Sequence, residues 1–387
     1  MRKIAVVILV IATLSLAVAY WWLPGRIESS LNGRIPHETY QVSEAGRRLH
    51  DSLFVADLHS DSLLWKRNLA DRADRGHMDL PRLRDGNVAL QVFSATTKSP
   101  KGQNYDENDA DTDQITSLVV AQFWPPRTWG SLFERAVYQL EKLKALAATG
   151  ELKLVTSQQE MRALVEARGQ GGDVVGAVYL IEGAHPLEGD IDNLDRLFDQ
   201  GLRIVGLTHF FDNELGGSLH GTTGDGLTEF GRAVVKRADE LGMIIDIAHA
   251  SPKMVREVLA QTTRPTILSH GGLKGNCDTP RNLEDDLMVE FAKRGGLLGV
   301  GFWDAAVCDD TPAGVVKAIR YGIDLLGIDH VALGSDYDGA TAVRFDVGEL
   351  AIITDEMLAQ GFTEAEIRAV MGDNARRFLL ENLPDSR

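Results

Sequence analysis

Two residues in the first third of the chain, His59 and Asp61, could together hold a divalent metal ion. They follow a short apolar run at residues 53–55. Side chains two positions apart in a strand point to the same side, so an imidazole and a carboxylate at one strand end can meet at one point. The pair alone is weak evidence, because His-x-Asp occurs by chance in many chains. Its meaning depends on whether the remaining sequence supplies further ligands.

Further metal-capable side chains stand where other apolar runs end: Glu182, His209, His249, His270 and Asp336. Taken singly, each is more often a structural residue than a ligand. If the runs are strands of one parallel barrel, all seven side chains lie at the same rim, where barrel enzymes carry their chemistry. The joint pattern therefore predicts a metal site.

The ligand types divide naturally between two ions. His59 and Asp61 form one pair, and His249 and His270 form another. Glu182 is a carboxylate between the pairs and can bridge two ions through its two oxygens. Three ligands per ion leave an open position on each for a shared hydroxide. Histidine and carboxylate without thiolate predict two zinc ions, with manganese or iron as alternatives.

Three residues remain for catalysis and substrate binding. Asp336 could accept a proton from the water and pass it to a leaving group. His209 could donate a hydrogen bond to a developing oxyanion. Arg281 could bind a substrate carboxylate with two parallel hydrogen bonds, although an isolated arginine is more often a surface ion-pair partner.

The elements that would position these residues follow a repeating pattern. Amphipathic helical segments alternate with eight apolar, β-branched runs at residues 53–58, 88–93, 174–181, 203–208, 243–248, 265–269, 296–302 and 330–335. Continuously apolar strands are covered on both faces, which is typical of a parallel sheet. Eight such units within residues 51–387 predict an α/β fold, a (β/α)8 TIM barrel. A doubly wound open sheet is the alternative.

Two regions depart from the alternation. Residues 96–128 are polar and acidic and leave the second strand on the active face, so they are either a lid or a solvated insertion. Residues 349–387 contain two helical patterns that should close the barrel against its first strand.

The N-terminal 25 residues predict a membrane anchor or a cleaved signal peptide. Arg2 and Lys3 precede an uncharged run at residues 4–19, and aromatic residues follow it. A helix over residues 4–24 would be about 31 Å long, enough to cross the hydrocarbon core. Ala17-Val18-Ala19 also suits signal peptidase. Residues 26–50 are expected to be a linker. The barrel would lie outside the cytoplasm, held at the cell membrane on the periplasmic or extracellular side, or released if the signal is cleaved.

Charge and cysteine content narrow the function further. The 387 residues carry a net charge of −16, which argues against nucleic acid as a partner. Cys277 and Cys308 are too few for a thiolate zinc site, and their spacing leaves a disulfide between them open. The sequence also leaves a homodimer open.

The motifs together resemble the membrane (renal-type) dipeptidases, a branch of the metal-dependent amidohydrolase barrels. The resemblance covers about residues 53–380 and rests on Asp57-Leu-His-Ser-Asp61, Glu182-Gly-Ala-His185, Leu207-Thr-His209, Asp246-Ile-Ala-His-Ala-Ser251, Ser269-His270, Arg281-Asn282 and Gly334-Ser-Asp-Tyr-Asp-Gly339. It implies a binuclear zinc dipeptidase acting on dipeptides, including ones with a C-terminal D-residue. The implied roles are those argued above: metal ligands His59, Asp61, Glu182, His249 and His270, a polarising His209, a proton-carrying Asp336, and Arg281 on the terminal carboxylate.

Two features differ from the family pattern. Trp303 stands where these enzymes often have a tyrosine, and the insertion at residues 96–128 is unusual. Both could alter substrate preference. The alternatives are a related hydrolase of other amides, lactones or β-lactams, or of a secreted peptide metabolite, and a non-catalytic surface protein on a degenerate barrel.

Overall fold

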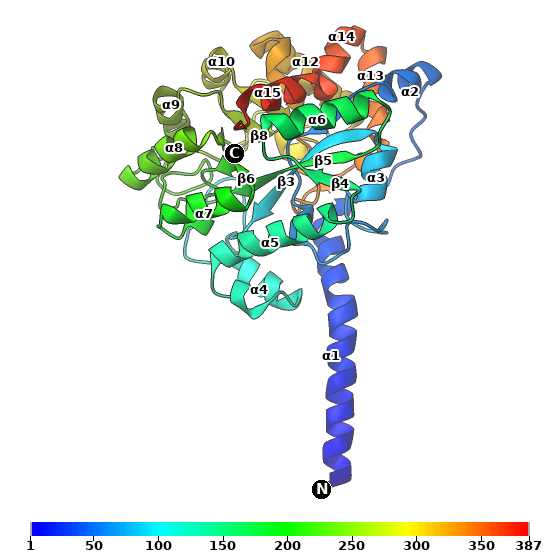
Figure 1. The fold of residues 1–387 in the computed structure, drawn as a ribbon, viewed down its shortest axis with the longest axis vertical. Coiled ribbons are helices and arrows are strands. Elements are labelled where there is room, and N and C mark those ends of the chain that lie inside the picture. Colours follow the sequence, from blue (N-terminus) through cyan, green and yellow to red (C-terminus); the bar gives the residue numbers. More distant parts are fainter. Residues whose placement is uncertain (1, 386–387) are drawn as a thin grey trace.

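The computed structural model describes residues 2–385, and the side chains of residues 2, 5–17 and 19 lie outside that description. Within this range, parallel strands close into an eight-stranded barrel in the order β3-β2-β10-β9-β8-β7-β6-β5, and a β3–β5 pairing completes the circle (Figure 1). The barrel strands are β2 (Val55–Asp57), β3 (Val88–Thr96), β5 (Val175–Glu182), β6 (Leu202–Gly206), β7 (Ile244–Asp246), β8 (Ile267–Gly271), β9 (Leu297–Val300) and β10 (Val331–Leu333). The predicted TIM barrel is confirmed.

Helices surround the barrel, and a few short elements lie outside it. The longer helices are α1 (Arg2–Leu31), α2 (Glu44–His50), α3 (Leu80–Asp85), α4 (Gln114–Ala121), α5 (Leu132–Ala147), α6 (Gln158–Gly169), α7 (Asp192–Gln200), α8 (Glu229–Leu241), α9 (Pro252–Gln261), α10 (Asp285–Lys293), α12 (Pro312–Leu326), α13 (Ala351–Ala359) and α15 (Asn374–Asn382). Short helices are η1 (Ser62–Leu64), η2 (Pro126–Thr128), η3 (His185–Leu187), α11 (Asp304–Val307), η4 (Ile328–His330), η5 (Val347–Glu349), α14 (Glu364–Arg368) and η6 (Ala369–Asp373). β4 (Leu152–Leu154) adds to the edge of β5, and β1 (Gly33–Arg34) pairs with β11 (Ala342–Val343).

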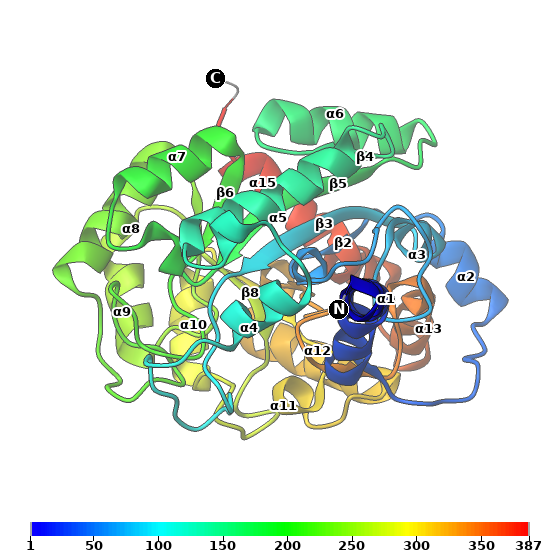
Figure 2. The ribbon, with the colours of Figure 1, turned by 90° about the horizontal axis from the view of Figure 1, so that it is seen from below.

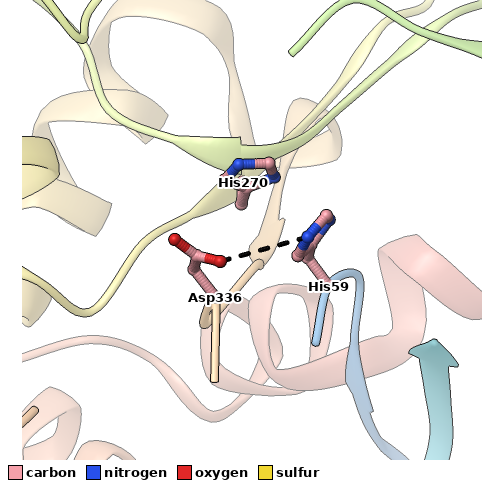
Figure 3. A group of neighbouring side chains, drawn as sticks. All are labelled: His59, His270 and Asp336. Carbon is pink, nitrogen blue, oxygen red and sulfur yellow. Dashed lines mark ion pairs between the residues drawn. The ribbon is translucent and has the colours of Figure 1, made fainter. Parts of the chain in front are cut away.

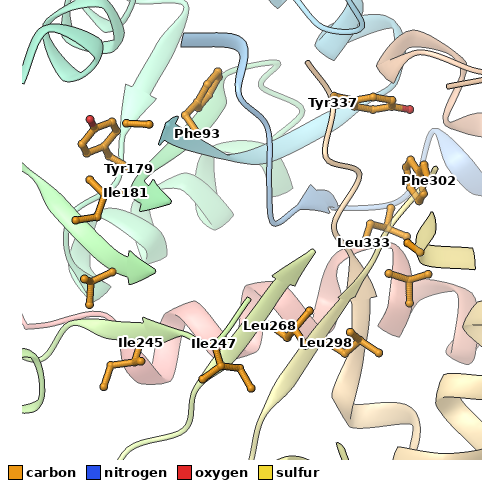
Figure 4. Close-up of a cluster of buried hydrophobic side chains, with 14 of the residues drawn as sticks. Phe93, Tyr179, Ile181, Ile245, Ile247, Leu268, Leu298, Phe302, Leu333 and Tyr337 are labelled. Carbon is orange, nitrogen blue, oxygen red and sulfur yellow. The ribbon is translucent and has the colours of Figure 1, made fainter. Parts of the chain in front are cut away.

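The barrel strands are apolar along their length because both of their faces are buried. Tyr179 in β5 points outward, since its hydroxyl donates to the carbonyl of Ala136 in α5 at 2.6 Å. Its neighbours Val178 and Leu180 therefore face the other side, where they belong to a cluster shared with every other barrel strand. Figure 4 shows the larger cluster around the strands, which includes Tyr179. This two-sided burial explains why the strands were recognisable as continuous apolar runs.

The C-terminal helices close the barrel, as the sequence predicts. η6 contacts both β2 and β10, and α15 packs beside it. At Gly372 in η6, a Cβ atom would lie only 1.7 Å from the carbonyl oxygen of Phe54, just before β2. Glycine is therefore needed where this segment crosses the first barrel strand.

The N-terminal helix α1 extends away from the barrel, at the end where α4 lies (Figures 1 and 2). The predicted anchor or signal segment falls largely on side chains outside the description. Among the residues that are described, no helix is both long and apolar enough to cross a membrane. Residues 26–50, expected as a linker, hold the end of α1, the strand β1 and the helix α2.

Candidate metal-binding active site

The structure brings all seven metal-capable side chains to the carboxyl ends of the strands. They come from β2, β5, β6, β7, β8 and β10 or from the residues that directly follow these strands. All are buried: His59, Asp61, Glu182, His209, His249, His270 and Asp336. The barrel closure therefore assembles groups that are up to 277 positions apart in the chain, from residue 59 to residue 336.

Glu182 lies at the centre of the cluster. Its Oε1 is 3.2 Å from Nε2 of His249, 3.4 Å from Nε2 of His270 and 3.7 Å from Nε2 of His59. Its Oε2 is 3.4 Å from Nε2 of His209. One carboxylate thus faces four imidazoles with both of its oxygens, which is the placement a bridging ligand requires.

The first pair of the sequence lies next to this carboxylate. Nε2 of His59 is 3.6 Å from Oδ2 of Asp61. The same nitrogen is 4.0 Å from Oδ1 of Asp336, and Figure 3 draws this ion pair between His59 and Asp336. Three groups of potential ligand atoms lie within 4.8 Å of one another: His59 with Asp61 and Glu182, His59 with His270 and Asp336, and Glu182 with His209 and His249. The predicted second set of Glu182, His249 and His270 is equally compact, since the two Nε2 atoms are 3.0 Å apart.

The electrostatics of the cluster fit a bound cation. Although burial acts to lower it, the carboxylates of Asp61, Glu182 and Asp336 raise the pKa of His59 to about 10. Nε2 of His59 is buried and has no hydrogen-bond partner. An excess of carboxylate charge around an unpartnered ligand nitrogen favours a positive ion at this point.

Ser269 orients two of the histidines. Its hydroxyl donates to Oδ2 of Asp246 at 2.6 Å. Nδ1 of His59 and Nδ1 of His270 each lie 3.0 Å from Oγ of Ser269. A hydroxyl has one proton and two acceptor lone pairs, so both Nδ1–H groups donate to Ser269. Nε2 of each ring is then free to bind a metal. This geometry fits a metal centre.

Thr96 contacts two of the carboxylates of the cluster, those of Asp61 and Glu182. Its Oγ1 lies 2.8 Å from Oε2 of Glu182 and 3.0 Å from Oδ1 of Asp61. Since the hydroxyl has a single proton, the two carboxylates compete for it, and the remaining oxygens stay available to an ion. Thr96 is the last residue of β3, where the acidic insertion begins.

Backbone strain accompanies two of the site residues. His249 has φ 62° and Asp336 has φ 58°, in the left-handed region that non-glycine residues rarely occupy. Such conformations persist where the surrounding fold imposes them, commonly at active sites. Burial, with Asp61 and Glu182 nearby, raises the pKa of Asp336 well above its ordinary value. A carboxyl with a raised pKa can take up and release a proton.

Arg281 faces the cluster from the loop after β8. It is buried, and one of its terminal nitrogens donates to the carbonyl of His270 at 2.8 Å. Its guanidinium lies 5.5 Å from the ring centroid of Trp303. Trp303 in turn donates to the hydroxyl of Tyr105 at 3.0 Å, so the acidic insertion at residues 96–128 reaches the side of the site where Arg281 lies. Arg281 is therefore a buried site residue and not a surface ion-pair partner.

A disulfide fixes the loops that carry these side chains. Cys277 and Cys308 are joined, closing a segment in which Arg281 lies near one end and Trp303 near the other. The sequence alone does not predict this bridge, because cysteine spacing along the chain does not give the distance between the two thiols in space.

Sequence reasoning missed the supporting residues. Asp246 and Ser269 stood inside the motifs but received no role, although their positions next to predicted ligand strands could have suggested one. Thr96 and Tyr105 had no local signal, since their partners are distant in sequence.

One protein-family model and several known proteins are similar to most of this chain. The family model for membrane dipeptidase (peptidase family M19) matches residues 43–383. Dipeptidase 3 of Macaca fascicularis is 27% identical over 324 residues, which are 78% of this chain and 63% of that protein. The chain thus spans less than two thirds of the length of this relative. An uncharacterised Klebsiella pneumoniae protein encoded 5′ of pqqA is 31% identical over 258 residues, which are 62% of this chain and 93% of that protein.

Solved structures share the fold. A metallopeptidase from Rhodobacter sphaeroides, liganded with a phosphinate mimic of the dipeptide L-Ala-D-Ala, superposes with a TM-score of 0.67 at 25% identity, covering 86% of this chain and 99% of that chain. The probable dipeptidase PvdM from Pseudomonas aeruginosa gives a TM-score of 0.74 at 19% identity, covering 88% and 98%, and shows the fold alone.

Proposed function

Because this chain belongs to the membrane dipeptidase family (peptidase family M19), we propose that it is a metal-dependent dipeptidase that hydrolyses the peptide bond of dipeptides. The observation that carries the proposal is the placement of Glu182 against four imidazoles, with Arg281 beside them. The phosphinate mimic of L-Ala-D-Ala held by a relative of 25% identity supports small dipeptides, including those with a C-terminal D-residue, as substrates.

Two zinc ions suit the donor set. His59, Asp61 and Glu182 would hold one ion, and Glu182, His249 and His270 the other. When bound, the ions supply a water of lowered pKa and polarise the scissile carbonyl.

The chain's own residues bind the substrate and move its protons. Arg281 holds the terminal carboxylate through paired hydrogen bonds, which fixes the peptide bond over Glu182. Nδ1 of His209 lies 3.2 Å from the carbonyl oxygen of Lys98, which can only accept, so this nitrogen keeps a proton. Nε2 of His209 points into the site, 3.4 Å from Oε2 of Glu182, so the ring is placed to polarise the carbonyl oxygen as negative charge develops. Asp336 accepts a proton from the attacking water and delivers it to the amine nitrogen as the C–N bond breaks.

We also propose that the enzyme works outside the cytoplasm, held there by the N-terminal segment. The disulfide between Cys277 and Cys308 supports an oxidising compartment, since such bridges are rare in the cytosol. Fractionation of cells expressing the full chain tests this: the protein should enter the membrane fraction and be open to protease added outside. Recovery in the cytosol would contradict the location.

Metal analysis combined with a dipeptide panel tests the activity. We expect close to two zinc ions per chain and hydrolysis of dipeptides but not of N-acyl amino acids. Replacement of Asp336 by Asn should keep the metal content and lower kcat by about 100-fold or more, because the proton carrier is lost. Full activity of Asp336→Asn would remove this residue from the mechanism, and less than one ion per chain would contradict the binuclear site.

A further inference from the structure

A cavity of about 370 Å³ extends from the metal-ligand cluster to a wall formed by the N-terminal helix. Such a volume is within the range of small-molecule sites and exceeds what a cluster of polar ligands alone requires. At one end lie the carboxylates and imidazoles of the site. Away from these ligands the lining is mostly apolar and comes from α1, from the turn at η1 and from α4, where Gln114 and Ser117 add polar groups. The large apolar lining residues are Ile27, Leu31, Leu64, Trp65, Ile115 and Leu118.

Two residues of α1 line this wall without being fully covered by the protein. Leu31 is 44% exposed although it is a large aliphatic residue, and it lines the cavity together with half-buried Ile27. Ile27 also packs against the small core formed by Trp65, Ile115 and their neighbours. An apolar side chain entering the cavity would cover surface that the protein itself leaves in contact with water.

Arg281 and the apolar part of the lining lie on different sides of the barrel. Arg281 follows β8, whereas Leu64 and Trp65 follow β2, and β10 and β9 separate these strands. A dipeptide with its carboxylate on Arg281 and its peptide bond over Glu182 therefore extends its other residue toward α1. The apolar wall faces the side chain of the N-terminal residue.

Buried ion pairs hold α1 in this position. Glu28, next to Ile27, is buried and pairs with Arg67, and also with Nε of Arg75 at 2.8 Å. Arg67 pairs in turn with Asp338, two residues after Asp336. Through Arg67, the helix is thus tied to the loop that carries the proposed proton carrier, and this network fixes its apolar residues relative to that loop.

We propose that the end of α1 is part of the substrate site and that Ile27, Leu31 and Leu118 select dipeptides whose N-terminal residue has a large apolar side chain. The inference rests on the proposed dipeptidase function. A leucine or phenylalanine side chain buries several more carbon atoms against this wall than alanine does. We therefore expect dipeptides with leucine or phenylalanine at the N-terminal position to have a kcat/KM at least about 10-fold higher than those with alanine.

The test uses the full chain, loaded with zinc, in detergent. Substrates share one C-terminal residue and vary in the N-terminal residue between alanine, leucine, phenylalanine and aspartate. The variant Ile27→Ser with Leu31→Ser should lower the leucine-to-alanine ratio of kcat/KM by about 5-fold or more. Trp21→Ser is the matched control, since Trp21 is 82% exposed on the same helix and lies outside the cavity. It should keep the wild-type ratio.

A second variant and a binding measurement guard against a folding defect. Leu118→Ser on α4 should lower the ratio in the same direction, and wild-type protein should bind a phosphinate dipeptide mimic with an N-terminal leucine side chain more tightly than its alanine counterpart. Two results would overturn this inference but leave the proposed function standing. One is a wild type that cleaves dipeptides with an N-terminal alanine as well as those with leucine, and the other is a set of variants that keep the wild-type preference for leucine. A zinc-loaded wild type that cleaves no dipeptide would instead overturn the proposed function.

Discussion

Removal of the disulfide between Cys277 and Cys308 should destabilise the barrel by an amount that the loop length sets. The two cysteines are 31 positions apart. Closing a loop of this length removes about 12 cal/mol/K of entropy from the unfolded chain, or about 3.7 kcal/mol at 25 °C. For the ~340 residues of the matched domain, the entropy of unfolding is roughly 0.7 kcal/mol per kelvin, so the melting temperature should fall by about 5 °C.

The assay compares wild type, the double variant Cys277→Ser with Cys308→Ser, and wild type kept in reducing agent. Thermal unfolding followed by circular dichroism should give the same lowered melting temperature for the last two samples. The KM for a dipeptide should rise several-fold as well, because the bridged segment carries Arg281 and Trp303. A double variant that melts within about 1 °C of an oxidised wild type lacking free thiols would refute the chain-entropy reasoning.

Three further perturbations have definite expected outcomes. Ser269→Ala removes the acceptor that orients His59 and His270, so zinc affinity measured against a chromophoric chelator should fall by about 10- to 100-fold; unchanged affinity would contradict the role. Glu28→Ala leaves Arg67 without one of its buried partners and should cost about 3 kcal/mol or more in urea unfolding, whereas a loss below about 0.5 kcal/mol would show that the pair is not stabilising. Burial lowers the pKa of His77 below its ordinary 6.5, and its neutral ring accepts from the amide of Asp338. As pH falls, the unfolded chain therefore takes up a proton on His77 before the folded chain does, so the stability contributed by this ring is present above about pH 6.5 and lost below it. His77→Asn should weaken the fall in the free energy of unfolding below that pH, and an unchanged dependence on pH would contradict this role of His77.

Most of the fold could be predicted from the sequence because parallel strands buried on both faces leave a continuous apolar pattern. All eight barrel strands coincide with such runs, and the ligand residues follow them at short, regular offsets. β4 is the informative exception. Of its three residues only the first is fully buried, so no continuous apolar run marks it, and it joins the edge of β5 outside the barrel.

The supporting contacts of the site could not be predicted, because they join residues that only the closed barrel brings together. Thr96 reaches Glu182, 86 positions away, and Tyr105 reaches Trp303, 198 positions away. The same is true of the N-terminal helix. Residues 26–50 are expected to be a linker, but Glu28 is buried and its charge is paired inside the protein.

The ion pairs of Glu28 also restrict how the N-terminal segment of this protein can be removed or replaced. An N-terminal segment that precedes a folded domain is usually exchangeable, because few contacts of the domain depend on its sequence. Here a cut after Leu31 would leave Arg67 and Asp338 without the carboxylate that completes their buried network. Any exchange of the N-terminal segment, by engineering or by recombination between genes, must therefore preserve the helix from about Ile27 onward or replace Arg67 at the same time.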